Sequence, residues 1–248
     1  MKAVILAAGY GTRLQRDVAA DSSGRFAHLA STAKPLLPTN ALHYAAFEDW
    51  AAGYTNVHIL SDQTSNNDER LGAVACLQLA VQHFKIDGHV VVIGGDTLFK
   101  EDFSLRAVKE RFSDLQAKFG DSCLVLSYQC RDEETHKYGI LEVDSDLRVL
   151  RMKEKPLPSE TKSRRACPCF YVLSKKSLPL LATFLEEKRD SPIEDRDAPG
   201  QFVSWLIPRK PVYIHQISGR FDVGNLCSYV ECDLYFREKL QNVQSYMV

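Results

Sequence analysis

The first fourteen residues constrain the fold more than any other segment of the chain. A short apolar run at positions 4–6 leads into small residues and the glycines Gly9 and Gly11, followed by Thr12 and Arg13. Glycine lets the main chain approach a ligand closely, backbone N–H groups can then point at an anion, and an arginine adds charge-assisted hydrogen bonds. The segment therefore predicts a buried strand whose carboxyl end forms a binding loop for phosphate groups.

Two common phosphate-binding motifs do not match this segment. The dinucleotide-binding motif needs a third glycine where Leu14 stands, and the P-loop needs a Gly-Lys-Ser/Thr sequence that is absent here. A tight turn after a strand would explain the glycines equally well if the segment stood alone.

Composition narrows the class of protein. The 248 residues are 45% hydrophobic and 25% charged, as in ordinary globular proteins, and they contain no repeat or low-complexity linker. We therefore expect a single domain over residues 1–248. The net charge of −1 disfavours a nucleic-acid partner, because nucleic-acid-binding domains usually carry a basic excess. No apolar run is long enough to cross a membrane and no secretory signal is recognisable, so the expected location is cytoplasmic, without a membrane partner.

The cysteines are expected to be reduced thiols, because their number is odd and they are scattered along the chain. The seven positions are Cys76, Cys123, Cys130, Cys167, Cys169, Cys227 and Cys232. Cys167 and Cys169 are the one close pair, but their spacing differs from the CxxC of zinc sites and no second pair completes a ligand set. A redox role for this pair is left open.

Apolar segments alternate with amphipathic ones along the chain. Strands are predicted at residues 3–6, 57–60, 90–93, 122–128, 139–143, 149–153, 166–173 and 212–217. Helices are predicted at 42–52, 71–84 (with Asn67 or Asp68 as a cap), 105–119, 178–189, 202–206 and 225–240, and polar loops at 15–33 and 189–200. This alternation predicts an α/β fold with a mainly parallel sheet, in which ligands bind at the carboxyl ends of the strands.

Further short motifs follow at intervals. They are Lys34-Pro35-Leu36-Leu37-Pro38, Gly94-Gly95-Asp96, Tyr138-Gly139, Glu154-Lys155-Pro156 and Phe221-Asp222-Val223-Gly224. With the first glycine segment, they stand in the order found in the sugar-1-phosphate nucleotidylyltransferases, such as glucose-1-phosphate thymidylyltransferase. The chain resembles this family over nearly its whole length. The resemblance implies a Rossmann-like three-layer α/β sandwich around a mainly parallel mixed sheet.

The resemblance also implies a reaction and a role for each motif. A nucleotidyl group would pass from a nucleoside triphosphate to a sugar 1-phosphate, with release of pyrophosphate. The catalytic cations would be Arg13 and Lys34. The nucleotide would be bound by Ala8, Gly9, Gly11, Thr12, Gln63 and Gly72. The sugar and its phosphate would be bound by Tyr138, Gly139, Glu154 and Lys155. The ligands of a Mg²⁺ cofactor would be Asp96 and Asp222.

Each of these roles has a simpler alternative. Asp96, after two glycines, could cap a loop or a helix, and Asp222 could be an ordinary turn residue. Glu154 and Lys155 could form a solvated surface pair of little energetic value. The common order of the motifs along the chain favours the functional interpretation.

One region departs from the family pattern. In the family, the Lys-Pro motif is followed by a helix, a strand and a second helix, whereas residues 38–44 lead directly into a segment that resembles the second helix. One helix–strand unit is therefore lacking. Its loss would open a sheet edge beside the first strand or bring residues 57–60 into that place. We expect the chain to be less stable and less active than one with the full pattern.

Other functions stay open at this point. The chain could be a catalytically impaired or non-catalytic regulatory protein that binds a nucleotide or a sugar phosphate, or a transferase for another phosphorylated small molecule. The base and the sugar are not fixed by the sequence. The apolar side chains of residues 225–240 suit either a core or a subunit interface, so a homo-oligomer is a further possibility.

Overall fold

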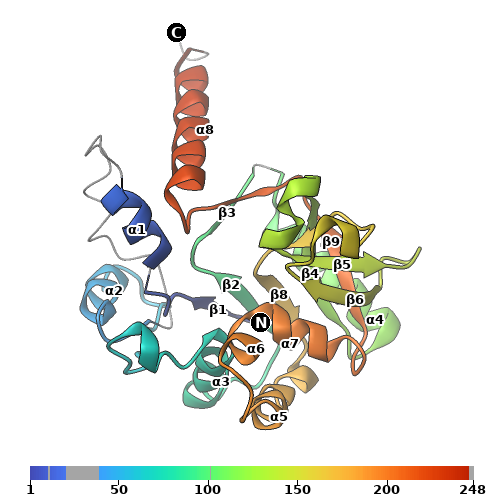
Figure 1. Ribbon diagram of the computed structural model, residues 1–248. Coiled ribbons are helices and arrows are strands. Elements are labelled where there is room, and N and C mark those ends of the chain that lie inside the picture. The colour runs from blue at the N-terminus through green and yellow to red at the C-terminus, as the bar shows by residue number, and fades with distance from the viewer. Residues whose placement is uncertain (11, 21–38, 101, 246–248) are drawn as a thin grey trace.

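The structure is a computed structural model that describes residues 1–10, 12–20, 39–100 and 102–245. Its centre is an eight-stranded mixed sheet in the order β1, β2, β8, β4, β7, β5 and β6, with β9 paired to β4 (Figure 1). The strands are β1 (Lys2–Leu6), β2 (Val90–Gly94), β4 (Cys123–Gln129), β5 (Gly139–Val143), β6 (Val149–Glu154), β7 (Arg165–Cys167), β8 (Phe170–Leu173) and β9 (Val212–Gln216).

Among the five strands β1, β2, β8, β4 and β9, all except β8 point in the same direction. β1 is parallel to β2 and β4 is parallel to β9, while β8 lies antiparallel between β2 and β4. β7, β5 and β6 extend the sheet through antiparallel pairs. A separate two-stranded antiparallel sheet joins β3 (Thr97–Phe99) to β10 (Arg220–Asp222). The predicted α/β class with a mixed sheet is confirmed.

Helices cover both faces of the central sheet and produce three layers. The α-helices are α1 (Thr12–Ala20), α2 (Tyr44–Ala51), α3 (Ala73–His83), α4 (Leu105–Phe119), α5 (Leu180–Glu187), α6 (Glu194–Asp197), α7 (Pro199–Leu206) and α8 (Leu226–Ser245). The 3₁₀ helices span Asn67–Glu69, Asp132–Lys137, Pro158–Glu160 and Lys175–Ser177.

Two hydrophobic clusters, one on each face, show how the layers pack. Leu77 of α3 and Phe184 of α5 belong to the first cluster, together with Val125 of β4. Phe112 of α4 belongs to the second cluster, together with Leu124. Leu124 and Val125 fall into different clusters because successive residues of a strand face opposite sides of the sheet.

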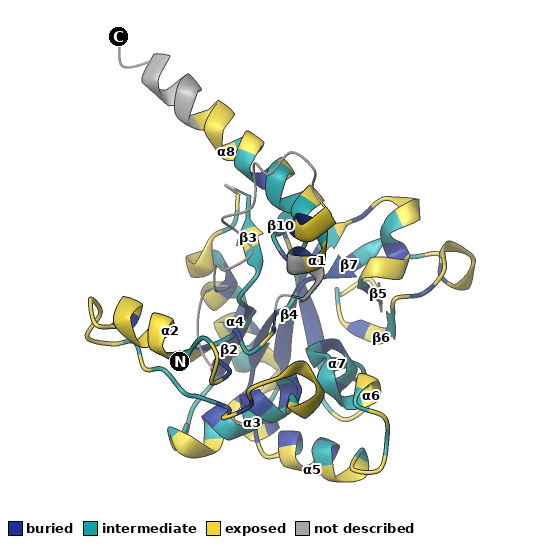
Figure 2. Ribbon diagram, turned by 60° about the vertical axis from the view of Figure 1, so that its left-hand side comes forward, coloured by how far each residue is buried: buried dark blue, intermediate teal, exposed yellow. Residues whose placement is uncertain are grey.

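Helix α8 projects from the body of the molecule, and its residues 236–239 are exposed (Figures 1 and 2). Its first turn packs against α1, where Leu14 and Val18 contact Leu226 and Tyr229. The Leu226 N–H also donates to a carboxylate oxygen of Asp17 at 3.3 Å. The helix that follows the first glycine segment is thereby joined to the helix that follows β10. No described helix is long and apolar enough to cross a membrane.

The predicted strand at 57–60 is wrong. This segment is irregular, and the pairing seen beside it among the described residues is one parallel bridge between Thr39 and Ser61. The backbone N–H of Thr39 donates to the Leu60 carbonyl at 2.9 Å, and the N–H of Asp62 donates to the Thr39 carbonyl at 2.9 Å. Within the described residues, β1 therefore has β2 on one side and no strand on the other. Over the part of the chain that the structure describes, the edge of β1 is therefore open, which is one of the two outcomes expected from the lacking helix–strand unit.

Several other predicted elements differ from the structure for local reasons. The single strand predicted at 166–173 is divided into β7 and β8 at Pro168, whose nitrogen carries no hydrogen for a sheet bond. The polar loop predicted at 15–33 begins as helix, because α1 continues to Ala20. The loop predicted at 189–200 contains α6 and the start of α7. Neither Asn67 nor Asp68 caps α3; Asn66 caps the short helix before it, and Gly72 occupies the N-cap position of α3.

Candidate functional site

A cavity of about 270 Å³ lies at the carboxyl ends of β1 and β2. The glycine segment stands at the carboxyl end of β1, and the Gly94-Gly95-Asp96 motif stands at the carboxyl end of β2. Four residues predicted to bind nucleotide or metal line the cavity: Ala8, Gly9, Gly72 and Asp96. The strand ends bring them together from three distant parts of the sequence, as expected for an open α/β sheet.

One wall of the cavity is a hydrogen-bonded network that holds the glycine segment. The Tyr10 hydroxyl lies 2.6 Å from the Thr64 hydroxyl, which donates to the buried Asp62 carboxylate at 2.8 Å. The Asn40 side-chain amide donates to the Ala8 carbonyl at 3.3 Å. These bonds fix the backbone beside Gly9. No motif in the sequence pointed to Asp62 or Asn40.

The opposite wall is organised by Asp197 of α6. One of its carboxylate oxygens accepts from the Ala73 N–H at 2.7 Å and so caps α3, and the other accepts from Arg70 Nε at 3.2 Å. Gly72 has φ of +91°, and a Cβ there would lie 3.1 Å from the Asp197 Cα. Only glycine combines this backbone conformation with such a close approach. The predicted importance of Gly72 thus has a steric basis.

The backbones of the two residues predicted to hold metal are brought together by the β3–β10 ribbon. Asp222 is paired with Thr97, and the backbone N–H of Val223 donates to the Asp96 carbonyl at 2.9 Å. The Asp222 carboxylate accepts from the Gly224 N–H at 2.9 Å. The ribbon was not predicted, since its three-residue strands carry no apolar run.

This acidic pair suits a magnesium ion better than a metal held by protein alone. No group of three or more potential metal-ligating side chains occurs among the described residues. Mg²⁺ is commonly bound by one or two carboxylates, with water and substrate phosphates as its other ligands. The donor set at Asp96 and Asp222 therefore fits the expected cofactor.

The four residues predicted to bind the sugar and its phosphate form a second group. Gly139 and Glu154 are partners across the β5–β6 pair, and the Lys155 N–H donates to the Tyr138 carbonyl at 3.0 Å. The Glu154 carboxylate is enclosed by backbone: Cβ atoms on Gly139 and Gly200 would lie 3.1 and 2.7 Å from its Oε2. Burial raises the pKa of Glu154, and Lys155 opposes that rise. Glu154 is therefore not the solvated surface residue of the simpler alternative.

Arg220 connects this second group to the acidic pair. Its guanidinium lies 3.3 Å from the Asp222 carboxylate and 5.3 Å from the centre of the Tyr138 ring. No motif singled out Arg220. The signal that could have found it is its position two residues before Asp222 in an extended segment, where both side chains face the same side.

The remaining predicted residues differ in what the structure shows of them. Gln63 is exposed, with φ of +64°, and is not among the residues that line the cavity. Arg13 and Thr12 lie in the first turn of α1, directly after the glycine segment. Gly11 and Lys34 fall outside the described residues.

Cys169 lines the cavity beside Gly94. Burial and, to a smaller extent, the nearby Asp96 raise the pKa of its thiol to about 12. The thiol is therefore protonated at neutral pH, and a protonated thiol is a poor nucleophile. All seven cysteines are free, as expected.

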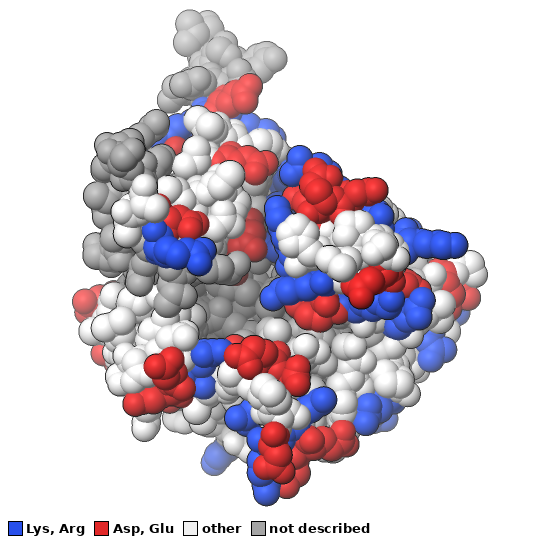
Figure 3. All heavy atoms as spheres, viewed as in Figure 1, with Lys and Arg blue, Asp and Glu red and all other residues white. Residues whose placement is uncertain are grey.

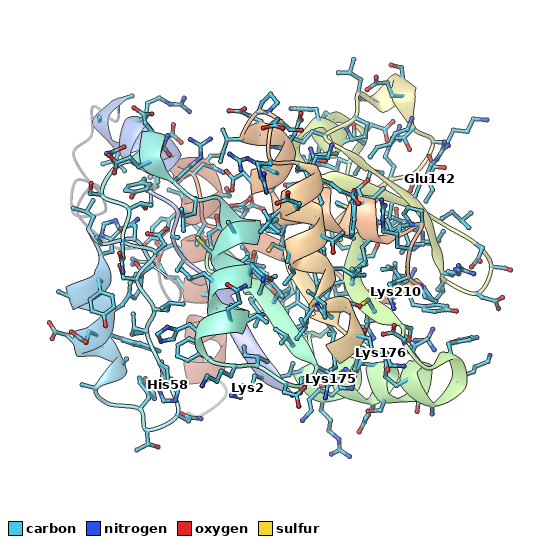
Figure 4. All side chains as sticks on the ribbon, turned by 90° about the horizontal axis from the view of Figure 1, so that it is seen from below. Lys2, His58, Glu142, Lys175, Lys176 and Lys210 are labelled. Carbon is cyan, nitrogen blue, oxygen red and sulfur yellow. The ribbon has the colours of Figure 1, made fainter. Side chains whose placement is uncertain are left out.

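Basic side chains gather at the opposite end of the sheet. Figure 4 labels Lys2, Lys175 and Lys210, which stand at the start of β1, after β8 and before β9. Lys175 pairs with Asp87, and Lys210 pairs with Asp121. On the face seen in Figure 3, acidic and basic groups are interspersed rather than gathered by sign. This face therefore carries no broad basic surface among its described residues.

The layered sheet, the cavity at the carboxyl ends of its strands and the acidic residues Asp96 and Asp222 define an α/β protein with a candidate ligand-binding site. The family model described as nucleotidyl transferase matches residues 27–239. The chain belongs to this nucleotidyl transferase family.

Known proteins agree with this assignment. The chain is 25% identical over 155 residues to glucose-1-phosphate adenylyltransferase of Yersinia pseudotuberculosis; the match covers 60% of this chain and 33% of the relative. The chain thus spans about a third of the length of the curated relatives that it matches. The fold is similar to that of a protein from Bacillus anthracis assigned as a glucose-1-phosphate thymidylyltransferase, in complex with sucrose (TM-score 0.69, 20% identity, 95% and 94% of the two chains). It is also similar to UDP-glucose pyrophosphorylase in complex with UDP-glucose (TM-score 0.67, 18% identity, 96% and 98%).

Proposed function

We propose that the chain transfers a nucleotidyl group from a nucleoside triphosphate to a sugar 1-phosphate and releases pyrophosphate. The observation that carries this proposal is the junction between the two halves of the site. Asp96 lines the cavity at the glycine segment, Asp222 is held beside it, and Arg220 joins Asp222 to the Tyr138 group. Two phosphorylated substrates that react with each other need two adjoining sites of this kind.

In this proposal the cavity holds the nucleotide. The backbone at Ala8 and Gly9 and the start of α1, which carries Arg13, face the phosphates. A helix N-terminus and bare backbone N–H groups favour such anions. Apart from Gly9 itself and its two neighbours in the chain, no described residue has an atom within 4 Å of the position that a Cβ of Gly9 would take. The open space beside this backbone supports its use by a ligand.

The Tyr138 group holds the sugar 1-phosphate in the proposed reaction. The buried Glu154 carboxylate can accept hydrogen bonds from sugar hydroxyls, and Lys155 can neutralise the phosphate. An oxygen of that phosphate then attacks the nucleotide's α-phosphorus and pyrophosphate leaves, with Arg13 and Lys34 as the proposed cations for the phosphates. Such a reaction depends on positioning and charge stabilisation more than on covalent catalysis.

We propose Asp96 and Asp222 as the residues that hold Mg²⁺. When bound, the ion would neutralise phosphate charge during the transfer. The free thiols further support a reducing compartment such as the cytoplasm as the place of action.

The decisive experiment follows pyrophosphate release. The chain is incubated with Mg²⁺, with each common nucleoside triphosphate and with a panel of sugar 1-phosphates, after circular dichroism has shown that the sample is folded. Pyrophosphate is expected with at least one pair, and Asp96→Asn is expected to lower its rate of release strongly. Asp195→Asn is the matched control, because Asp195 is an exposed carboxylate.

Two outcomes would contradict the proposal. A folded chain that releases no pyrophosphate with any pair is not this enzyme. Undiminished turnover by Asp96→Asn would show that Asp96 has no part in the reaction.

A further inference from the structure

Arg220 occupies a position that the transfer reaction does not by itself explain. Arg220 and Asp222 lie on the same side of β10, because residues two apart in a strand share a face. Phe221, between them, is buried and packs against the Tyr235 ring. The ribbon therefore fixes the relative positions of Arg220 and Asp222 by its backbone.

The Arg220 side chain is almost completely buried, with 8% of its surface exposed. Nη1 and Nη2 lie 3.3 and 3.4 Å from the same oxygen of Asp222. Nε is buried without a hydrogen-bond acceptor among the described residues. A buried cation with an unused donor is costly to keep, so its position calls for an explanation beyond packing.

Two carboxylates near Arg220, those of Asp222 and Asp96, stabilise its charge at neutral pH. Burial is the largest single influence and lowers the pKa of Arg220, but Tyr128, Asp222, Tyr138 and Asp96 together raise it above its ordinary value. Both carboxylates of the proposed metal pair are thus within electrostatic reach of the guanidinium. Two neighbouring carboxylates repel each other, and a fixed positive charge between them relieves this repulsion.

We propose that Arg220 is a positioning residue that acts as the resident counter-ion of the Asp96–Asp222 pair. This inference rests on the proposed function and deepens it. Through Asp222, Arg220 holds the acidic pair in place before a divalent cation arrives. Through its charge, and through its place over the Tyr138 ring, it favours the phosphate of the second substrate.

Removal of the Arg220 charge should change the affinities for a cation and for an anion in opposite directions. Arg220 competes electrostatically with a divalent cation for the acidic pair, so removal of its charge strengthens cation binding. The same removal weakens binding of an anion, because a positive charge near the phosphate is lost. A few ångströms of separation in a partly buried site make an effect of about threefold to tenfold reasonable in each direction. Simple structural damage would weaken both.

The test uses the full chain with Mn²⁺ and inorganic phosphate as probes. Mn²⁺ binding is measured by electron paramagnetic resonance, and phosphate binding by ³¹P line broadening in the absence of Mn²⁺. The variants are Arg220→Met, an apolar replacement of similar length, and Arg220→Gln, which keeps a donor for Asp222 and serves if the first does not fold. Asp222 is 23% exposed at its side chain, so water can hydrate it once Arg220 is replaced.

Arg209→Met is the matched control. Arg209 also stacks on an aromatic ring, 3.8 Å from Trp205, and lies 3.4 Å from a carboxylate, that of Glu187. It does not line the cavity at the glycine segment. Its replacement should leave the affinities for Mn²⁺ and phosphate unchanged.

The expected result is tighter Mn²⁺ binding and weaker phosphate binding in the folded Arg220 variants. Mn²⁺ binding that is unchanged or weaker in these variants would overturn the counter-ion role while leaving the proposed cation site intact. Failure of the unaltered chain to bind Mn²⁺ would overturn the cation site and, with it, this inference.

Discussion

The backbone N–H of Val223 donates to the carbonyl oxygen of Asp96 at 2.9 Å. This single bond places Asp222, at the end of β10, beside the motif that follows β2. The bond explains how Asp222 comes to lie beside Asp96, which lines the cavity, although the two residues are distant in the sequence. It also explains why the site depends on a short ribbon rather than on the central sheet alone.

Gly9→Val should block the nucleotide without disturbing the fold. Beyond its own chain neighbours, a Cβ at Gly9 would meet no atom of a described residue within 4 Å, yet Gly9 lines the cavity. We expect nucleoside triphosphate binding, measured by calorimetry, to weaken at least tenfold, equivalent to about 1.4 kcal/mol. The thermal midpoint should stay unchanged. Gly88→Val, where the space is equally open, is the control, and a variant that binds nucleotide normally would refute the cavity assignment.

Glu154→Gln should stabilise the protein at neutral pH while it weakens sugar-phosphate binding. Burial raises the pKa of Glu154 above its ordinary value of 4.5. The folded state therefore prefers the protonated carboxyl, and stability falls as the pH rises from 4.5 through the raised pKa. The neutral glutamine avoids this loss. The thermal midpoint of the variant should exceed that of the parent chain at pH 8, and the difference should vanish below about pH 4.

Glu142→Gln is the control for this pH dependence, because the pKa of Glu142 is shifted in the opposite direction. Hydrogen bonding to Arg151 lowers the pKa of Glu142. Its contribution to stability is present above the ordinary pKa and is lost as the pH falls through the lowered value. The Glu142 variant should therefore melt below the parent chain at pH 8. Equal midpoints for Glu154→Gln and the parent at all pH values would show that Glu154 carries no burial penalty.

Asp197→Ala should remove the cap of α3 and loosen the wall of the cavity. Its carboxylate accepts from both the Ala73 N–H and Arg70. Loss of a helix cap costs about 1–2 kcal/mol of the free energy of unfolding. We expect the thermal midpoint to fall by about 3–6 °C. Asp195→Ala, an exposed carboxylate of the same helix, should have little effect; an equal fall there would show that the cap is not the cause.

A strand supplied beside β1 should stabilise the chain. Within the described residues, β1 is an edge strand that carries the glycine segment. An insert after Asn40 that restores the family's helix–strand unit would pair this edge and is expected to raise the thermal midpoint. A flexible insert of the same length, which supplies no strand, is the control. An equal or lower midpoint with the restored unit would contradict the idea that the edge is a weakness.

Much of the fold could be predicted because periodic apolar patterns decide it. The helix at 105–119 and the strand at 139–143 have the predicted bounds, since each has a clear pattern and a turn signal at both ends. The strand predicted at 57–60 was wrong because a short apolar run does not show whether a partner strand is available. The β3–β10 ribbon could not be foreseen, because its pairing comes from tertiary contact rather than from local pattern.

The candidate site was predictable to the extent that it lies at strand ends. Ala8, Gly9 and Asp96 line the cavity because they follow two parallel strands whose carboxyl ends meet at one edge of the sheet. The prediction that the first strand is buried is wrong: Val4 is its one buried residue, since β1 stands at the edge of the described sheet. Asp62 and Arg220 were missed, since their roles depend on neighbours from other parts of the chain. Gln63 is exposed, whereas its neighbour Asp62 is buried and lines the cavity. A local sequence does not reveal which of two adjacent side chains faces inward.

The central claim is that Asp96 and Asp222 act as one site. A double-mutant cycle on the rate of pyrophosphate release tests it, with Asp96→Asn, Asp222→Asn and the double variant measured as kcat/KM beside the parent chain. Residues that act as a unit show non-additive losses. The expected result is a double variant no worse than the poorer single variant to within about threefold. Losses that multiply, or full activity in either single variant, would contradict the claim.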